Sequence, residues 1–138
     1  MDRSPFRTCA ALGLMCLTAA AQPAADPVNP SCPMVLNWST YPRMKFSAET
    51  IDGLKILKAE GLVDEDVPLR LKDALDSNAP IDEIWLRSPG GDARAGNAAG
   101  KLIRTQGIPT RIPAGWACFS ACNFIFMGGV VRFVDRGG

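Results

Sequence analysis

Apolar residues recur along this chain with two spacings, and these spacings predict an alternation of strands and helices. Short apolar runs bounded by turn residues, such as Ile84-Trp85-Leu86, are typical of buried strands. Apolar residues at i, i+4 and i+8, such as Val67, Leu71 and Leu75, indicate one buried helix face. The predicted strands cover residues 54–62, 81–87, 108–112 and 130–134, and the predicted helices cover residues 64–76, 92–106 and 120–127.

Capping residues mark the ends of these elements. Asp92 stands where a helix N-cap belongs, Gly107 stands at a left-handed C-cap position, and Pro68 suits a first helical turn. Because strands and helices alternate, the sequence predicts an α/β fold with right-handed crossovers and a mainly parallel sheet. Sites in such sheets gather where strands end, which here means the turn at residues 88–91 and the turn before Ser120.

The first residues resemble a targeting segment. Arg3 and Arg7 precede an uncharged, mostly apolar run over residues 9–21 that ends in three alanines. This pattern is typical of a secretory signal peptide over residues 1–21, so a periplasmic or secreted protein is expected. The run is too short to span a bilayer comfortably, and no stable membrane span is expected after cleavage near Ala21. The alternative is an uncleaved signal that anchors the chain in the membrane.

Residues 22–41 are rich in Pro and Ala and predict a linker or N-terminal arm, with a short strand over residues 34–38. Residues 42–138 then form the folded part, since 138 residues allow little more than one domain. The hydrophobic fraction of 47% and the charged fraction of 21% exclude a disordered or fibrous chain. A net charge of +1 gives no electrostatic case for nucleic acid.

The chain contains no histidine. This absence excludes a complete Ser-His-Asp or Cys-His site within the chain, and any zinc site that needs imidazole. No metal or other cofactor is expected. Three cysteines remain after signal cleavage, Cys32, Cys118 and Cys122, and an oxidising compartment favours disulfides. They are interpreted first as buried thiols, next as a disulfide that involves Cys118 or Cys122, with Cys32 as one candidate partner, and last as a catalytic thiol.

Two turns carry candidate chemistry. In Ser88-Pro89-Gly90-Gly91, the glycines permit positive φ and close ligand approach, and their amides at a helix N-terminus can face an oxyanion. The alternative is a tight strand-to-helix turn without a ligand. Ser120 opens a helix directly after a turn, either as an ordinary N-cap or as a nucleophile whose following amide, that of Ala121, donates to the oxyanion.

The two turns together, SPGG and then Cys-Phe-Ser-Ala-Cys across a helix and a strand, resemble the ClpP/crotonase-like superfamily. The chain is most similar to the proteolytic subunit of Clp protease and its exported relatives of the form CxSAC, over about residues 84–134. The resemblance implies a spiral of β-β-α units, Ser120 as nucleophile, and Gly91 (with Gly90 beside it) and Ala121 as the oxyanion hole. It also implies a peptide or protein substrate and assembly of several copies.

The sequence departs from this pattern after Ser120. The resemblance places a histidine base, and further on an aspartate, beyond the strand over residues 130–134, and this chain ends at Gly138. We therefore expect residues 42–138 to be the N-terminal part of the domain and the chain to be nearly inactive by itself. Two alternatives remain open: a non-catalytic peptide-binding or assembly module of the same fold, and a crotonase-type acyl-CoA enzyme, which export disfavours.

Overall fold

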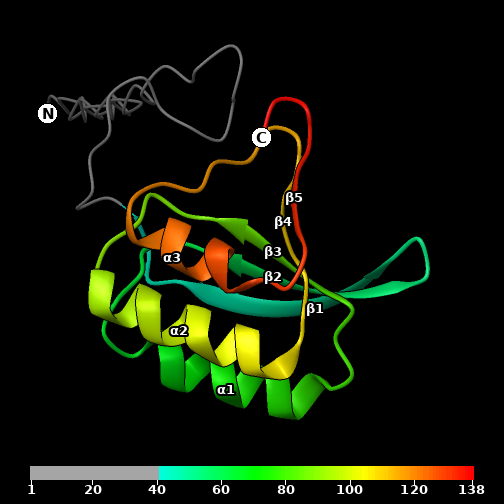
Figure 1. Cartoon of the computed structure of the whole chain (residues 1–138), viewed down its shortest axis with the longest axis horizontal. Helices are drawn as coiled ribbons and strands as arrows, with labels where there is room; N and C mark the ends of the chain where they lie inside the picture. Colours follow the sequence, from blue (N-terminus) through cyan, green and yellow to red (C-terminus); the bar gives the residue numbers. More distant parts are fainter. Residues whose placement is uncertain (1–40) are drawn as a thin grey trace, which may run out of the picture.

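The computed structural model describes residues 41–138, and the expectations for residues 1–40, including the strand at 34–38 and the state of Cys32, lie outside the described part. Five strands and three helices make up this part (Figure 1). In chain order they are β1 (Lys45–Ile51), β2 (Leu54–Glu60), α1 (Val67–Asn78), β3 (Glu83–Arg87), α2 (Ala93–Gln106), β4 (Thr110–Ile112), α3 (Ala121–Gly128) and β5 (Arg132–Val134).

The five strands form one mixed sheet in the order β1-β2-β3-β4-β5. Strand β1 pairs with β2 in antiparallel register, and each of the other three neighbouring pairs is parallel. The predictions of an α/β fold and of a mainly parallel sheet are therefore confirmed for the described residues. Each of the predicted strands and helices between residues 54 and 134 is present, and its ends lie within three residues of the predicted ones.

Strand β1 is the element that the apolar pattern missed. Its sequence KFSAETI is mostly exposed, so the strand carries no apolar run that would reveal it. The hairpin that joins it to β2 turns at Asp52 and Gly53, which have φ of 50° and 82°. An Asp-Gly pair with positive φ at both positions is the usual two-residue hairpin turn. This dipeptide was the sequence signal for the strand.

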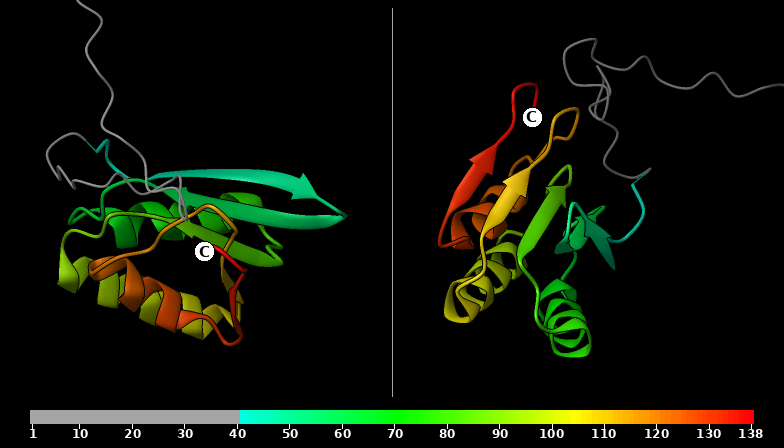
Figure 2. Two further views of the ribbon diagram at one scale, coloured as in Figure 1. Left: turned by 90° about the horizontal axis from the view of Figure 1, so that it is seen from above. Right: turned by 90° about the vertical axis from the view of Figure 1, so that its right-hand side faces the viewer.

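The three helices lie on one side of the sheet (Figure 2) and share one hydrophobic core with it. Alternate residues of β2 and β3 point into this core, among them Leu57 and Leu86, which are fully buried. The predicted apolar face of α1 packs here through Val67, Leu71 and Leu75. The predicted caps of α2 are confirmed, because the Asp92 carboxylate accepts the Ala95 N–H at 2.7 Å and Gly107 is left-handed.

The opposite side of the sheet is held by charge and aromatic contacts. The Arg111 guanidinium donates to both Glu83 carboxylate oxygens, at 2.8 and 3.0 Å, and to Asp135 at 2.6 Å. It also lies over the Phe133 ring, 4.4 Å from the centroid. These hydrogen bonds from Arg111 hold the pKa of Glu83 below its usual value. A bidentate pair of this kind ties β3 to β4 and to the segment after β5.

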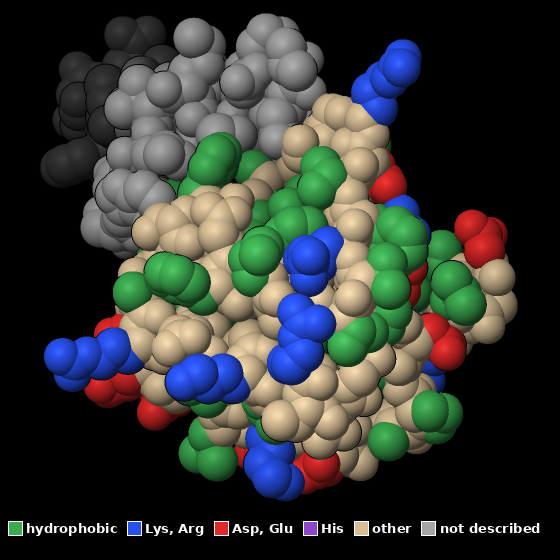
Figure 3. Space-filling model, in the orientation of Figure 1, with side chains coloured by type: hydrophobic (Ala, Val, Ile, Leu, Met, Phe, Trp, Pro, Cys, Tyr) green, Lys and Arg blue, Asp and Glu red, His purple; other side chains and the backbone are tan. Residues whose placement is uncertain are grey.

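Exposed apolar side chains concentrate on the last part of the chain. On the face drawn in Figure 3, hydrophobic side chains lie in several places among Lys and Arg side chains. Seven of the nine large hydrophobic residues that are exposed in the described part fall between residues 119 and 134: Phe119, Phe124, Met127, Val130, Val131, Phe133 and Val134. Such a concentration is typical of a surface that contacts another protein, and the expected assembly of several copies stays a prediction.

Glycines let the backbones of α2 and α3 approach each other closely. A Cβ atom at Gly96 would overlap the carbonyl of Ala121, and one at Gly100 would overlap the carbonyl of Phe124. Gly128, at the other end of α3, lies against the backbone of Gly100. Because Ser120 directly precedes α3, this close packing against α2 also fixes where the serine stands.

Replacing Gly100 by alanine tests this packing. Alanine favours a helix by about 1 kcal/mol over glycine, but its methyl group would force α3 away from α2, and overpacking costs typically about 1–3 kcal/mol or more. We expect Gly100→Ala to lower the free energy of unfolding in urea by about 2 kcal/mol. The matched control is Asn97→Ala on the exposed side of α2, which should be neutral or slightly stabilising. Equal stability of the two variants would contradict the close approach.

The Asp64 carboxylate stabilises the loop between β2 and α1. Asp64 pairs with Arg43 at 2.9 Å and with Arg70, and it also accepts the Asp66 N–H at 3.1 Å. Burial alone would raise the pKa of Asp64, but the hydrogen bonds from Arg43, Arg70 and the Asp66 backbone outweigh it and lower the pKa from 3.8 to about 2. The folded state therefore favours the ionised carboxylate.

This pKa difference predicts an acid-dependent loss of stability. Since the folded pKa lies below the unfolded one, the contribution is present above about pH 4 and disappears as the pH falls toward 2. Between pH 5 and pH 2, the wild type should lose about 2 kcal/mol more unfolding free energy than Asp64→Asn. Asp73→Asn, at an exposed position of α1, is the control and should follow the wild-type pH dependence. Parallel curves for Asp64→Asn and wild type would refute the prediction.

Candidate active site

Ser120 lies on a sharp turn between an extended segment and a helix. The Ser88 N–H donates to the Ala117 carbonyl at 2.8 Å, and the Phe119 N–H donates to the Ser88 carbonyl at 3.0 Å. The segment before Ser120 therefore continues the sheet beside the end of β3, and α3 begins immediately after the serine. This strand-turn-helix arrangement is the context in which a nucleophile is presented at the edge of a sheet.

The backbone of Ser120 is strained. Its φ is 50° and its ψ is −119°, a conformation that residues with a side chain rarely adopt. Holding a residue there costs about 1–3 kcal/mol, which the surrounding structure must offset. The side chain of Ser120 is exposed and makes no capping hydrogen bond to α3. The interpretation of Ser120 as an ordinary N-cap is therefore wrong, because a capping serine bonds its own helix from an extended backbone.

The turn over residues 88–91 is hydrogen-bonded to the loop after β2. The Val63 N–H donates to the Gly90 carbonyl and the Asp92 N–H donates to the Val63 carbonyl, both at 2.7 Å. Gly90 and Gly91 have φ of 98° and 138°, which confirms the predicted positive φ at both glycines. Sequence reasoning missed Val63, because a backbone contact of this kind leaves no signal in residue types.

The two turns touch each other. A Cβ atom built on Gly90 would lie 2.7 Å from the Cβ of Ser120 and 2.7 Å from the carbonyl oxygen of Phe119. Only a glycine leaves room for the serine turn at this point. The structure therefore brings together the two motifs that the sequence singled out, although they are separated by a helix and a strand.

The backbone amides near Ser120 differ in availability. The Gly90 N–H donates to the Ser88 hydroxyl oxygen at 3.0 Å, so this amide is engaged. The hydrogen bonds of residues 41–138 include none donated by the N–H of Gly91 or of Ala121. Gly91 is exposed, and Ala121 opens α3 directly after the serine. Of the glycine pair, Gly91 is thus the one whose N–H is not already used in a hydrogen bond within residues 41–138.

The cysteines on either side of Ser120 form a disulfide. Cys118 and Cys122 are joined with their Cα atoms 5.3 Å apart, and the bond closes a small ring around the serine. The structure therefore contains a disulfide that involves Cys118 and Cys122, as in the second interpretation, but they bond each other and not Cys32. The first interpretation of these residues, buried free thiols, is wrong. The same bond leaves no free thiol at this position, which also rules out the catalytic-thiol interpretation in this state.

Few titratable side chains are available to serve Ser120 in the described part. Asp135 is held by Arg111, and Lys101 is exposed on α2, where it lines a shallow hollow with Phe124 and Met127. Among residues 41–138, no cluster of three or more His, Cys, Asp or Glu side chains could hold a metal ion. The helices in that range are too short or too polar to cross a membrane. Comparisons with protein-family models and with curated proteins find no match to this chain.

Replacing Ser120 by glycine tests the backbone strain. Glycine adopts positive φ without steric cost, so Ser120→Gly should raise the free energy of unfolding by about 1 kcal/mol. Ser120→Ala keeps the Cβ atom and should not show this gain. Ser77→Gly near the end of α1 is the matched control and should be destabilising, since glycine disfavours a helix. A Ser120→Gly protein no more stable than Ser120→Ala would mean that the serine is not strained.

Proposed function

We propose that this chain carries the nucleophile and the oxyanion hole of an exported serine peptidase-like hydrolase that works by acyl transfer. The observation that carries the proposal is the left-handed, strained backbone of Ser120 at a strand-to-helix turn. Structures retain such strain mainly where function requires the conformation. The resemblance of SPGG and CxSAC to the ClpP/crotonase-like superfamily supports the same assignment.

In the proposed mechanism, the Ser120 hydroxyl oxygen attacks a carbonyl carbon and forms the tetrahedral intermediate. The N–H groups of Gly91 and Ala121 donate to the oxygen that becomes negatively charged. Backbone amides fixed in advance need no reorganisation at that moment, and removing one such donor typically costs about 100- to 1000-fold in rate. The Gly91 amide is held by the hydrogen bonds of Val63 to its neighbours Gly90 and Asp92.

The hydroxyl proton of Ser120 must pass to a base, and the chain has no histidine to receive it. An oxyanion hole without a base retains part of the catalysis over water. We therefore expect slow chemistry from the 138-residue chain alone, with the proton leaving to solvent or to an added base.

A fluorophosphonate probe tests the nucleophile. The Ser120 oxygen should form a bond to phosphorus while the P–F bond breaks, and the proton and fluoride leave to solution. Because no side-chain imidazole is present, added imidazole should accelerate labelling in proportion to its concentration. Mass spectrometry should place the label on Ser120.

Two variants make this experiment decisive. Ser120→Ala should abolish labelling, whereas Ser77→Ala, which removes another exposed serine, should label at the wild-type rate. A folded wild-type protein that stays unlabelled at high imidazole would refute the nucleophile role. That result would favour the non-catalytic peptide-binding module instead.

A further inference from the structure

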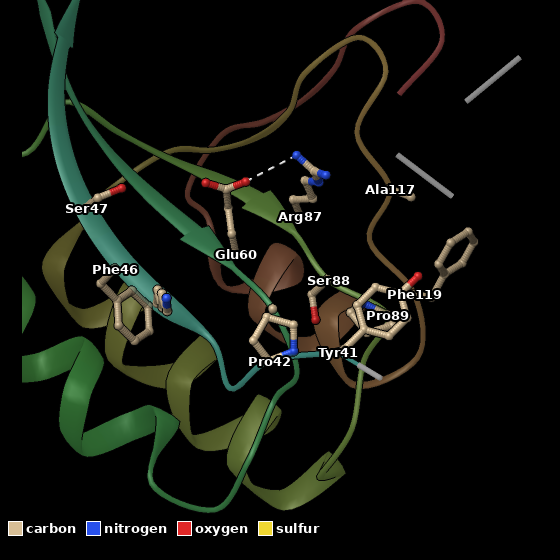
Figure 4. A pocket seen from close by; sticks show the side chains of 12 residues that line it. Tyr41, Pro42, Phe46, Ser47, Glu60, Arg87, Ser88, Pro89, Ala117 and Phe119 are labelled. Carbon is tan, nitrogen blue, oxygen red and sulfur yellow. Dashed lines mark hydrogen bonds and ion pairs between the residues drawn. The ribbon is translucent and has the colours of Figure 1, made fainter. Parts of the chain in front are cut away.

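A cavity of about 430 Å³ opens at the carboxyl ends of β2 and β3 (Figure 4). Four separate stretches of the chain form its walls: the start of β1, the end of β2, the turn after β3, and the segment that leads to Ser120. Neither Ser120 nor Gly90 lines the cavity, but Phe119 and Pro89, the residues just before them, do. Its walls are therefore continuous with the backbone of the candidate active site.

Aromatic and apolar side chains make up half of the lining residues. Tyr41 and Phe46 come from the entry to β1, and Pro89 and Phe119 come from the two turns at the candidate active site. The volume falls within the range of small-molecule sites and exceeds what one large side chain needs. The cavity suits an aromatic or branched apolar group.

The cavity is lined by Lys45, Glu60 and Arg87, and these charged residues differ in whether they form an ion pair. Arg87 contacts Glu60 at a long 3.4 Å, and its guanidinium lies 5.8 Å from the centre of the Trp116 ring. In the part of the chain that the structure describes, Lys45 has no carboxylate partner. Two cations and one carboxylate line the cavity, so its charge favours an anionic ligand and disfavours an amine.

We infer that this cavity binds a ligand that combines an aromatic group with a carboxylate, such as the C-terminal residue of a peptide. The ring lies among the aromatic side chains, and the carboxylate lies near Lys45 and Arg87. That such a ligand is part of the substrate of Ser120 rests on the proposed function, whereas its binding does not.

N-acetyl-phenylalanine and its amide are the matched probes, since they differ in the carboxylate alone. Tryptophan fluorescence can report binding, because Arg87 contacts the Trp116 ring. The carboxylate probe should bind the full chain about tenfold more tightly than the amide at low salt, and this difference should shrink as salt is added. Equal affinities for the two probes would overturn the inference.

Single charge changes at the cavity should move the affinity in opposite directions. Lys45→Gln should weaken binding of the carboxylate probe about threefold, as expected for one exposed ion pair. Glu60→Gln should tighten it about threefold, because it removes the negative charge and releases Arg87. The control is Lys101→Gln on α2, which should leave the affinity unchanged. The same change in all three variants, or in none, would show that the carboxylate binds elsewhere.

This test is separate from that of the proposed function. Ser120→Ala should retain the preference for the carboxylate probe even though it cannot be labelled. Binding without labelling would refute the nucleophile and leave the cavity assignment standing. Labelling without a preference for the carboxylate probe would support the nucleophile and refute the cavity assignment.

Discussion

The strained backbone of Ser120 is the constraint on which the rest of the site depends. A φ of 50° costs free energy at a residue with a side chain, so neighbouring contacts must hold it. The extended segment before the serine is hydrogen-bonded to Ser88, and the helix after it is packed against the glycines of α2. The Cys118–Cys122 disulfide joins the segment before the serine to the helix after it. Sheet pairing, helix packing and a covalent bond thus fix the same turn from three directions.

The second turn follows from the same geometry. Because the serine turn comes so close to the end of β3, position 90, which faces this turn, has room only for a glycine. Its carbonyl and the Asp92 amide are then fixed by Val63, while its own amide is occupied by the Ser88 hydroxyl. The amide of Gly91 donates none of the hydrogen bonds within residues 41–138. One close approach therefore accounts both for the choice of glycine and for an available donor.

The sequence predicted the helices well because their signals are local. The apolar face of α1 and the caps of α2 each depend on residues of a single helix and its ends. The apolar pattern missed β1, whose residues are mostly exposed, and only the Asp-Gly pair of its hairpin turn signalled the strand. The sequence also could not choose between an N-cap and a strained turn at Ser120, since both begin a helix with serine. A disulfide of Cys118 or Cys122 was among the interpretations, but the sequence could not choose its partner, because three cysteines allow several pairings. The cavity joins side chains from distant segments, such as Tyr41 and Phe119, which no local pattern connects.

The features on which the proposed hydrolase function rests are mostly features of the backbone. Strain at Ser120 and the available amides of Gly91 and Ala121 need small residues and fixed turns, and they arise without any titratable side chain. A base, in contrast, is a single side chain that must be brought to the serine oxygen. The two parts of a catalytic site are therefore physically separable, and the proposed function assigns only the first of them to this chain, which has no histidine. Under the proposed function, oxyanion stabilisation is the part that a fold can supply through its backbone amides alone, because such donors are fixed in place before the reaction.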